Sequence, residues 1–299
     1  MSVLIVGIGA LGCLFAARLA ASGCPVTMLG SWPDGLAALR KHGVRLLEMD
    51  GSSQNYPVEL MVGPECQGNF IHALVLVKAW QTERAARQLE HCLSEAGLAL
   101  TLQNGLGNYE ILSDRLTPGR VALGVTTVGA RMLEPGYVQY TGKGRVSIGA
   151  SPNIDQLAGL LTDAGFQVEI TPDPTSLLWG KLVINAAINP LTALLRVANG
   201  ELLDRPGAHA LLAEVAREAA LVAMEGGAVL PYPNPVAAVE EVARNTASNY
   251  SSMLQDVQRG AITEIEAING AIVRMGERSG IPTPVNKMLY QLVSSLDHH

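Results

Sequence analysis

Short apolar runs alternate with helical patterns in the first half of the chain, and only helical patterns follow after about residue 170. Runs of consecutive apolar residues predict buried strands at 2–6, 26–29, 44–47, 58–62, 73–77, 98–102 and 121–128. Helices are expected at 79–93, 175–197, 206–226, 233–247 and 250–279. The segments around Val138 and Val146 are expected to pair as an antiparallel hairpin that completes the sheet. The pattern predicts a parallel-sheet domain over 1–170, an all-helical domain over 171–299 and a cleft between them.

The first strand leads directly into a glycine-rich turn, Gly7-Ile8-Gly9-Ala10-Leu11-Gly12, and a helical pattern follows. Between a strand and a helix, this spacing predicts a dinucleotide-binding turn. Its glycines permit a tight bend, close approach of a pyrophosphate and close helix–strand packing. The helix N-terminus at Ala10 and Leu11 adds free N–H groups for the phosphates. A plain strand-turn-helix is the alternative. The predicted fold class is therefore α/β, with an N-terminal Rossmann-type dinucleotide-binding domain and a C-terminal all-α domain.

Polar residues follow three of the predicted strands, where ligands bind in open parallel sheets. Gly30 and Ser31 follow the second strand, with no carboxylate before Asp34. An NAD site usually has an acid at this position, so Ser31 favours NADP, although no arginine stands beside it to hold a 2′-phosphate. Lys78 and Asn104 follow two later strands and are candidate ligand contacts. The alternatives are an ordinary exposed lysine and an ordinary turn asparagine.

Three polar residues interrupt an otherwise apolar helical stretch at 179–191, namely Lys181, Asn185 and Asn189. A helix advances about 100° per residue, which places Asn185 about 40° and Asn189 about 80° around the axis from Lys181. Burial of an unpaired charge or amide is costly, so one shared polar face predicts the wall of a cleft. The alternative is a lysine that extends out of the core beside two asparagines bonded to neighbouring backbone.

A second polar stripe is expected on the predicted helix 250–279, where Asn249, Ser252 and Asp256 have i, i+3, i+7 spacing. Such a stripe is equally typical of a solvated helix face. The sequence pattern alone does not distinguish a ligand-binding stripe from a solvated face.

Composition narrows the classes of partner and location. The 299 residues are 48% hydrophobic and 16% charged, with a formal net charge of −6, which argues against nucleic acid or an acidic membrane as partner. Cys13, Cys24, Cys66 and Cys92 have neither metal-ligand spacing nor a disulfide framework, so reduced thiols, a cytoplasmic location and no metal site are expected. No apolar stretch of transmembrane length and no signal-peptide pattern are evident. The apolar helical segment is compatible with a homodimer.

Several separate motifs together resemble the ketopantoate reductase (2-dehydropantoate 2-reductase) family over essentially the whole chain. The motifs are Gly7 to Gly12, Val77-Lys78-Ala79-Trp80-Gln81, Gln103-Asn104-Gly105-Leu106-Gly107, Trp179-Gly180-Lys181 with Asn185 and Asn189-Pro190-Leu191-Thr192-Ala193, Asn199-Gly200-Glu201-Leu202, and Ser251-Ser252-Met253-Leu254-Gln255-Asp256 with Thr263-Glu264-Ile265. The glycine turn is generic. The lysine–asparagine helix and the last motif are specific.

The resemblance implies NADPH-dependent reduction of 2-dehydropantoate to pantoate, on the route to pantothenate and coenzyme A. It implies Lys181 as the catalytic lysine and Glu264 as its acidic partner. It assigns substrate contacts to Asn104, Asn185, Asn189, Asn249 and Ser252, and cofactor contacts to Gly7, Gly9, Ala10, Leu11, Gly12, Ser31, Lys78 and Asn104. Many members have arginine where this chain has Ser31, so Lys78 is expected to carry more of the 2′-phosphate contact.

Two other functions are compatible with the same sequence. One is an NADP-dependent reductase of this fold that acts on another small 2-keto acid, since resemblance indicates reaction class better than substrate. The other is a nucleotide-binding regulatory protein without turnover, which would be expected to lack the lysine or its glutamate. Both residues are present.

Overall fold

The computed structural model describes residues 2–63 and 68–297. The chain divides into two compact units. The first consists of Met1–Gln103 and Asn108–Pro174, and the second of Asn104–Gly107 and Thr175–His299. A four-residue loop that follows a strand of the first unit therefore packs with the helices of the second. The predicted fold class, a Rossmann-type parallel sheet followed by a helical domain, is confirmed.

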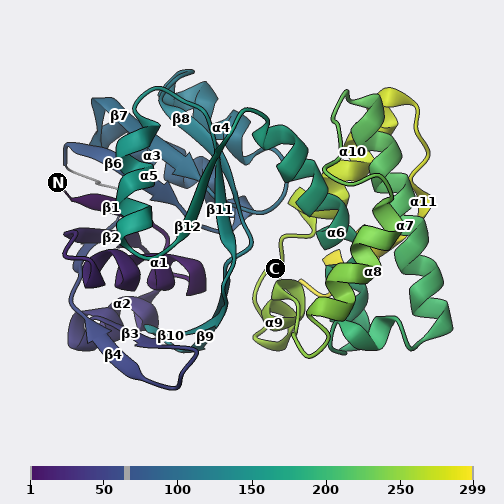
Figure 1. The fold of residues 1–299 in the computed structure, drawn as a ribbon, viewed down its shortest axis with the longest axis horizontal. Coiled ribbons are helices and arrows are strands. Elements are labelled where there is room, and N and C mark those ends of the chain that lie inside the picture. The colour runs from purple at the N-terminus through teal and green to yellow at the C-terminus, as the bar shows by residue number, and fades with distance from the viewer. Residues whose placement is uncertain (1, 64–67, 298–299) are drawn as a thin grey trace. The chain divides into compact units, whose positions relative to one another are not determined.

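An eight-stranded sheet forms the centre of the first unit, in the order β12-β11-β8-β7-β6-β1-β2-β5 (Figure 1). Neighbouring strands are parallel except β8 and β11. The strands are β1 (Val3–Val6), β2 (Val26–Gly30), β5 (Glu59–Val62), β6 (Phe70–Val75), β7 (Leu93–Thr101), β8 (Val121–Thr126), β11 (Arg145–Gly149) and β12 (Gln167–Thr171). The order reverses at β1, so the glycine turn that follows β1 lies at the switch point where parallel sheets bind ligands.

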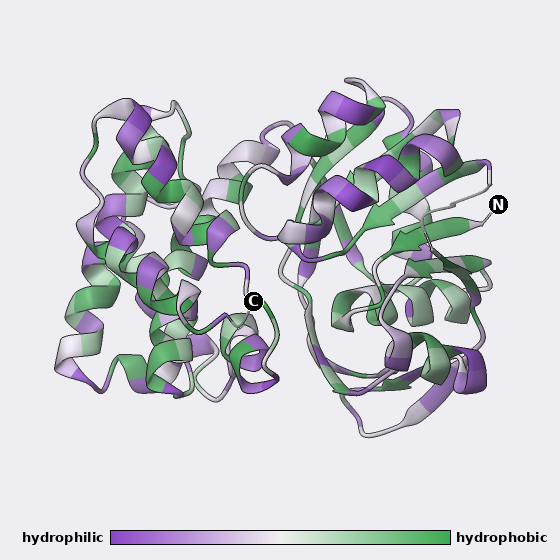
Figure 2. Ribbon diagram, turned by 180° about the vertical axis from the view of Figure 1, so that it is seen from behind, coloured by the Kyte–Doolittle hydropathy of each residue, from purple (hydrophilic) through white to green (hydrophobic). Residues whose placement is uncertain are grey.

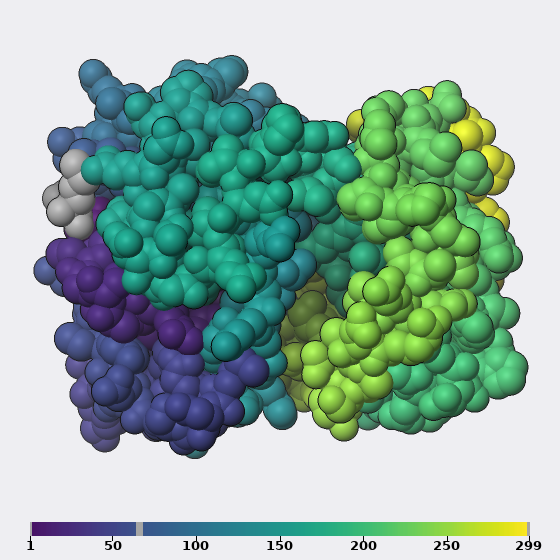
Figure 3. Space-filling view, in the orientation of Figure 1, coloured from purple at the N-terminus to yellow at the C-terminus, as the bar shows by residue number. Residues whose placement is uncertain are grey.

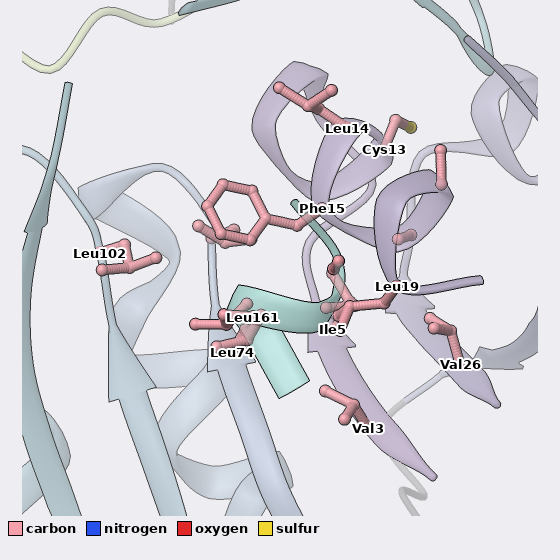
Figure 4. Packing of buried hydrophobic residues seen from close by; sticks show 14 of the residues in the cluster. Val3, Ile5, Cys13, Leu14, Phe15, Leu19, Val26, Leu74, Leu102 and Leu161 are labelled. Atoms are coloured by element: carbon pink, nitrogen blue, oxygen red, sulfur yellow. The ribbon is translucent and has the colours of Figure 1, made fainter. Parts of the chain in front are cut away.

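Both faces of this sheet are covered at its centre, which explains why central strands such as β1 are continuously apolar. Successive residues of β1 point to opposite faces, so Ile5 packs with Phe15 of α1 (Ala10–Ala21) and Leu4 packs in the opposite cluster. Figure 4 shows Phe15, Leu161 and Leu74 among the buried side chains of this cluster. The first face is covered by α1 and α5 (Ile154–Asp163), whose side chains hide the central strands in Figure 3. Figure 2 shows the strands as mainly hydrophobic.

The other helices of this unit are α2 (Pro33–His42), the 3₁₀ turn η1 (Ala79–Gln81), α3 (Thr82–Cys92) and α4 (Asn108–Leu116). Leu89 of α3 and Leu112 of α4 are fully buried in the second apolar cluster with Leu4. These two helices therefore cover the face of the sheet opposite α1 and α5.

The predicted hairpin between the segments around Val138 and Val146 is wrong. Val138 lies in a separate four-stranded sheet of order β4-β3-β10-β9, while Val146 lies in β11 of the large sheet. The small sheet contains β3 (Val44–Leu47), β4 (Ser53–Tyr56), β9 (Gly129–Glu134) and β10 (Tyr137–Gly142). The physical reason is that each segment pairs with an earlier strand, Val138 with Met132 of β9 and Val146 with Thr126 of β8. Between them Gly144 packs closely, since a Cβ there would lie 2.2 Å from the carbonyl carbon of Thr127. This glycine leads the chain from one sheet to the other without reversing it.

The second unit is helical. It consists of α6 (Pro174–Leu195), η2 (Gly200–Leu202), α7 (Pro206–Glu225), α8 (Pro235–Asn245), α9 (Ser252–Gln258), the π-helical turn η3 (Glu266–Gly270), α10 (Ala271–Ser279) and α11 (Pro284–Ser294). Its core joins Val183 of α6, Val215 of α7, Ile272 of α10 and Val293 of α11. Helix α11 is additional to the helices expected from the sequence.

The single helix expected over 250–279 is wrong, since an irregular segment separates α9 from η3. The N–H groups of Arg259 and Ala261 both donate to the carbonyl oxygen of Asp256, and Gly260 has φ +63°. These interactions end α9 in a tight turn. Glycine suits position 260 because it adopts positive φ without strain. Glu264 lies in the resulting break.

Two smaller expectations also differ from the structure. Within the described residues α6 alone is long and apolar enough to cross a membrane, but 67% of its apolar window is buried inside the protein, as in a core helix.

Cys13 and Cys24 are free thiols, whereas Cys92 is disulfide-bonded. The expectation of reduced thiols fails for Cys92 because sequence spacing does not reveal which sulfurs the fold brings together. Cys66 lies outside the described residues.

Candidate active site

The glycine turn after β1 combines two close backbone packings with one open position. A Cβ at Gly12 would lie 2.1 Å from the carbonyl oxygen of Gly7, so α1 packs against the turn only without a side chain. Gly7 has φ +123° and donates its N–H to the carbonyl of Leu29 over 2.8 Å. Gly9 differs, because a Cβ there would meet no atom within 4 Å. The packing of the protein does not require this glycine, which leaves close approach of a ligand as its explanation.

Helix α1 begins immediately after Gly9, with Ala10 and Leu11 in its first turn, and no side chain caps it. Its N-terminal N–H groups and the positive end of its dipole suit an anion. The turn therefore fits the pyrophosphate of a dinucleotide on geometric grounds.

Ser31 and Lys78 flank the glycine turn in the sheet. Ser31 is exposed directly after β2, and Lys78 follows β6 as the N-cap of η1. These two strands are the neighbours of β1, so both residues lie at the same carboxyl edge as Gly7. The segment around Lys78 is secured by Gln103, whose side-chain nitrogen donates to the carbonyl of Val77 over 2.9 Å.

Gln103 is part of a sequence motif, but no role was predicted for it. Its side-chain nitrogen also donates to the hydroxyl of Thr82 over 2.8 Å. Such side-chain bonds to a distant loop have no local sequence signal.

Lys181, Asn185 and Asn189 lie on α6, with the first two partly buried and Asn189 only 5% exposed. The side-chain nitrogen of Asn189 is buried and has no hydrogen-bond partner among the described residues. Buried donors of this kind are rare in native proteins. This amide is therefore a strong candidate to bond a ligand oxygen.

Lys181 and Glu264 lie close enough to interact electrostatically. Burial lowers the pKa of the Lys181 ammonium to about 8, while the negative charge of Glu264 acts in the opposite direction. Glu264 is only 6% exposed and accepts a hydrogen bond from the side-chain nitrogen of Asn104 over 3.2 Å. The structure thus brings together three predicted residues from three separate segments of the chain.

The position of Glu264 is further supported by its neighbour Thr263. The N–H and hydroxyl groups of Thr263 donate to the two carboxylate oxygens of Asp297, over 3.1 and 3.0 Å. A residue near the end of the chain therefore closes the turn that presents Glu264. No sequence pattern indicates this role for Asp297.

Tyr232 is a second residue without a predicted role. Its hydroxyl donates to the carbonyl of Gly180 over 2.9 Å, and burial raises its pKa far above the usual value. A Cβ at Gly180 would lie 2.6 Å from Pro231. The loop at 231–232 therefore packs tightly against the backbone beside Lys181. The hydroxyl of Tyr232 stays protonated and acts as a neutral hydrogen-bond donor.

The segment before α9 is attached to α6 near Asn189. The hydroxyls of Thr192 and Ser251 are 2.7 Å apart, and Thr192 also donates to the carbonyl of Asn189. Ser251 caps α9 by accepting from the N–H of Leu254. Ser252 is exposed in the first turn of α9, directly after this attachment.

The predicted polar stripe of Asn249, Ser252 and Asp256 is not one helix face. Asn249 precedes the helix, and its carbonyl accepts the N–H of Asn199 over 3.0 Å. Asp256 is only 2% exposed and pairs with Arg259, so it is not a solvated residue. Asn199 is buried with an unpartnered side-chain oxygen, judged over the described residues, and is a further candidate contact.

Taken together, the second unit places an ammonium, a carboxylate and several amides in one neighbourhood. This set can hold a small molecule that carries a carboxylate and hydroxyls, and can stabilise negative charge on a reacting oxygen. No three His, Cys, Asp or Glu side chains in the described parts of the chain could hold a metal ion together.

Sequence profiles and known proteins agree with this architecture. The profile "Ketopantoate reductase PanE/ApbA" matches residues 3–153, and its C-terminal counterpart matches residues 174–297. The 2-dehydropantoate 2-reductase of Archaeoglobus fulgidus is 39% identical (99% of this chain, 97% of that protein), and that of Halobacterium salinarum is 34% identical (98% of each).

Among solved structures, a ketopantoate reductase family protein from Ralstonia eutropha superposes with TM-score 0.92 at 32% identity, covering 99% of this chain and 98% of that chain. D-mandelate dehydrogenase in complex with NADH and anilino(oxo)acetate superposes with TM-score 0.93 at 26% identity and the same coverage. On the matching profiles and the near full-length identity, the chain belongs to the ketopantoate reductase family.

Proposed function

We propose that this protein reduces 2-dehydropantoate to pantoate with NADPH, in the biosynthesis of pantothenate and coenzyme A. The observation that carries the proposal is the partly buried Lys181 beside the buried Glu264. On the same helix as Lys181, the side-chain nitrogen of Asn189 is a buried donor without a partner among the described residues. A fixed cation next to hydrogen-bonding amides is what the reduction of a 2-keto acid requires.

Lys181 supplies the electrostatic part of the reaction. The bound cofactor supplies hydride, and negative charge then develops on the carbonyl oxygen of the substrate. The ammonium of Lys181 bonds this oxygen and donates a proton as the alkoxide forms. With a pKa of about 8, Lys181 is charged at neutral pH and is a stronger acid than an ordinary lysine.

Glu264 keeps the ammonium oriented and raises its pKa against the effect of burial. Asn104 fixes the carboxylate of Glu264 through its hydrogen bond. Asn185, Asn189, Asn249 and Ser252 are proposed to bind the carboxylate and the C4 hydroxyl of the substrate, and Glu264 can also accept from that hydroxyl.

The cofactor site is proposed to consist of Gly7, Gly9, Ala10, Leu11 and Gly12 around the pyrophosphate, with Ser31 and Lys78 near the adenosine ribose and Asn104 near the nicotinamide ribose. The absence of an acid beside Ser31 and the placement of Lys78 at the same sheet edge support NADPH over NADH. The named neighbour with NADH in its structure shares only 26% identity with this chain.

A substrate panel tests the proposal. Purified protein with NADPH is mixed with ketopantoate, 2-ketoisovalerate, pyruvate or phenylglyoxylate, and loss of the reduced nicotinamide absorbance is followed. 2-Ketoisovalerate serves as the control for the C4 hydroxymethyl group, because it is ketopantoate with a hydrogen in place of that whole group. Ketopantoate is expected to have the highest kcat/KM by at least about 100-fold, since a site built to bond a hydroxyl rejects analogues that lack it. Faster turnover of another acid would identify this protein as a different 2-keto acid reductase.

We also propose that the protein is a homodimer and that it is cytoplasmic. Exposed apolar side chains on α7 and α11, such as Leu221, Met224, Met288 and Leu292, support a homodimer, which sedimentation measures directly. The free thiols of Cys13 and Cys24 support a cytoplasmic location, while the disulfide-bonded Cys92 is unusual for that compartment.

A further inference from the structure

Pro190 leaves one carbonyl group of α6 without its helical partner. The N–H of residue 190 would normally donate to the carbonyl of Ala186, but proline has no N–H. The side-chain nitrogen of Asn269 donates to this carbonyl over 3.1 Å. Ala186 and Asn269 are both fully buried. A side chain 83 positions away therefore replaces a missing helix hydrogen bond between Lys181 and the end of α6.

Asn269 is also part of the π-helical turn η3 (Glu266–Gly270), which begins two residues after Glu264. The N–H of Gly270 donates to the carbonyl of Ile265 over 3.0 Å, and the N–H of Ile268 donates to the carbonyl of Glu264 over 3.1 Å. These bonds hold Asn269 and Glu264 in one short rigid segment. Single π turns of this kind occur frequently at functional sites.

A buried polar chain fixes the orientation of Asn269. Its side-chain nitrogen also donates to the side-chain oxygen of Asn286 over 3.0 Å. The nitrogen of Asn286 in turn donates to the carboxylate of Glu218 over 2.8 Å, so the oxygen of Asn286 must face Asn269. Glu218 is held by the N–H groups of Val285 and Asn286, each over 2.9 Å. If the Asn269 amide were turned over, its oxygen would face two acceptor oxygens, those of Ala186 and Asn286. Only the observed orientation avoids this repulsion.

We propose that Asn269 is a positioning residue, which sets the distance between Lys181 on α6 and Glu264 before the π turn. It is the side chain that bonds the backbone of the helix bearing Lys181 while belonging to the segment that presents Glu264. Asn104 restrains Glu264 from another direction, through the loop after β7. The inference rests on the proposed roles of Lys181 and Glu264.

The first test is Asn269→Ala. Loss of the bridge is expected to lower kcat by about 10- to 100-fold, since a shift of about 1 Å in a catalytic group has effects of this size. NADPH affinity, measured by binding titration, is expected to stay within about twofold of the wild type. The alkaline limb of kcat/KM should also move to lower pH, because Glu264 then supports the Lys181 charge less.

Pro190→Ala separates positioning from simple satisfaction of a buried carbonyl. Alanine at 190 restores the helical N–H donor for Ala186, so the double variant Pro190→Ala/Asn269→Ala should recover thermal stability relative to Asn269→Ala. It does not restore the bridge to the π turn, so its kcat and pH limb should remain altered. Recovery of activity together with stability would overturn the proposal.

Val293→Ala is the matched control for stability, because Val293 is fully buried in the same helical core and belongs to neither segment. It should lower the melting temperature without moving the pH limb. A shifted limb in this variant would mean that the shift reports instability alone, which contradicts the proposal.

A substrate-free measurement keeps the inference separate from the proposed function. NMR of isotopically labelled lysine, with Lys181→Ala used for assignment, follows the pKa of Lys181 without any keto acid. The pKa should fall in Asn269→Ala and stay low in the double variant. An unchanged pKa overturns the positioning role even where the enzyme turns over ketopantoate. A fall in pKa without ketopantoate turnover in the wild type rejects only the proposed substrate.

Discussion

The side-chain nitrogen of Asn104 donates to the carboxylate of Glu264 over 3.2 Å, although 160 residues separate them along the chain. The contact depends on Gly105, which lies so close to η3 that a Cβ would approach the carbonyl oxygen of Ala267 to 2.5 Å. That oxygen accepts the N–H of Leu106 over 2.9 Å. The loop after β7 is thus fastened to the segment that presents the acid.

Gly105→Ala should therefore displace Asn104 from Glu264 and reduce kcat/KM for the keto acid by roughly 10- to 100-fold. Gly107→Ala is its matched control, because Gly107 also has positive φ but a Cβ there would meet no atom within 4 Å. Both variants carry backbone strain, so only the difference between them reports the contact. Equal kcat/KM values for the two would argue against a role for the loop contact.

The pH dependence of reduction should follow the Lys181 ammonium. Its pKa is lowered to about 8 by burial, so the group is protonated below that pH and loses its proton above it. Reduction needs the proton, so kcat/KM should be constant at neutral pH and fall as pH rises through this value. Steady-state rates across the neutral and alkaline range measure the limb. A profile that stays flat until lysine's ordinary pKa would refute the assignment.

Lys181→Met should abolish most turnover and yet stabilise the fold at neutral pH. The folded-state pKa of Lys181 lies below the ordinary lysine value of 10.5, so the unfolded chain binds more protons between the two values. Stability of the wild type therefore rises with pH across that window, and the cost of the buried charge is fully present below pH 8. Methionine removes this cost, which after discounting for partial exposure is about 1–3 kcal/mol. Urea denaturation at neutral pH measures it, and a less stable variant would contradict the burial argument.

Gly9→Ala and Gly12→Ala should fail in different ways. A Cβ at Gly9 has open space, so the variant should keep wild-type thermal stability but bind NADPH at least about tenfold more weakly, because the methyl group obstructs the pyrophosphate. A Cβ at Gly12 would press on the backbone of Gly7, so that variant should lose stability by a few kcal/mol, on the order of other overpacked sites. Calorimetry and cofactor titration separate the two effects. Unchanged NADPH affinity in Gly9→Ala would exclude the turn as the phosphate site.

Lys78→Ala tests the choice of cofactor. A lysine that contacts the 2′-phosphate should contribute to the binding of NADPH and not of NADH. The variant should weaken NADPH by about 10-fold or more, in keeping with loss of a charge-assisted bond, and leave NADH nearly unchanged. Ser31→Arg is the complementary variant and should tighten NADPH alone. Equal losses for both cofactors in Lys78→Ala would place Lys78 away from the 2′-phosphate.

Much of this protein was predictable because its signals are local. Consecutive apolar residues such as those of β1 predict a strand buried on both faces, and the glycine spacing from Gly7 to Gly12 reflects packing between adjacent elements. The shared helix face of Lys181, Asn185 and Asn189 follows from helix geometry alone. These features depend on residues within a few turns of one another, so the sequence determined them by itself.

The tertiary structure decided the remaining features, because they depend on partners remote in sequence. Val138 and Val146 lie in different sheets because they pair with Met132 and Thr126, and no local turn signal distinguishes that outcome from a hairpin. The break before Glu264 similarly depends on contacts with Asp256 and Asp297.

Asn269 illustrates the same limit within the candidate site. Its neighbours Ile268 and Gly270 have no polar side chains, and nothing nearby indicates that its amide replaces the bond lost at Pro190. Sequence patterns and the family resemblance predicted the residues with reactive chemistry. Only the folded chain showed which distant side chains hold them in place, since hydrogen bonds between remote segments leave no periodic trace.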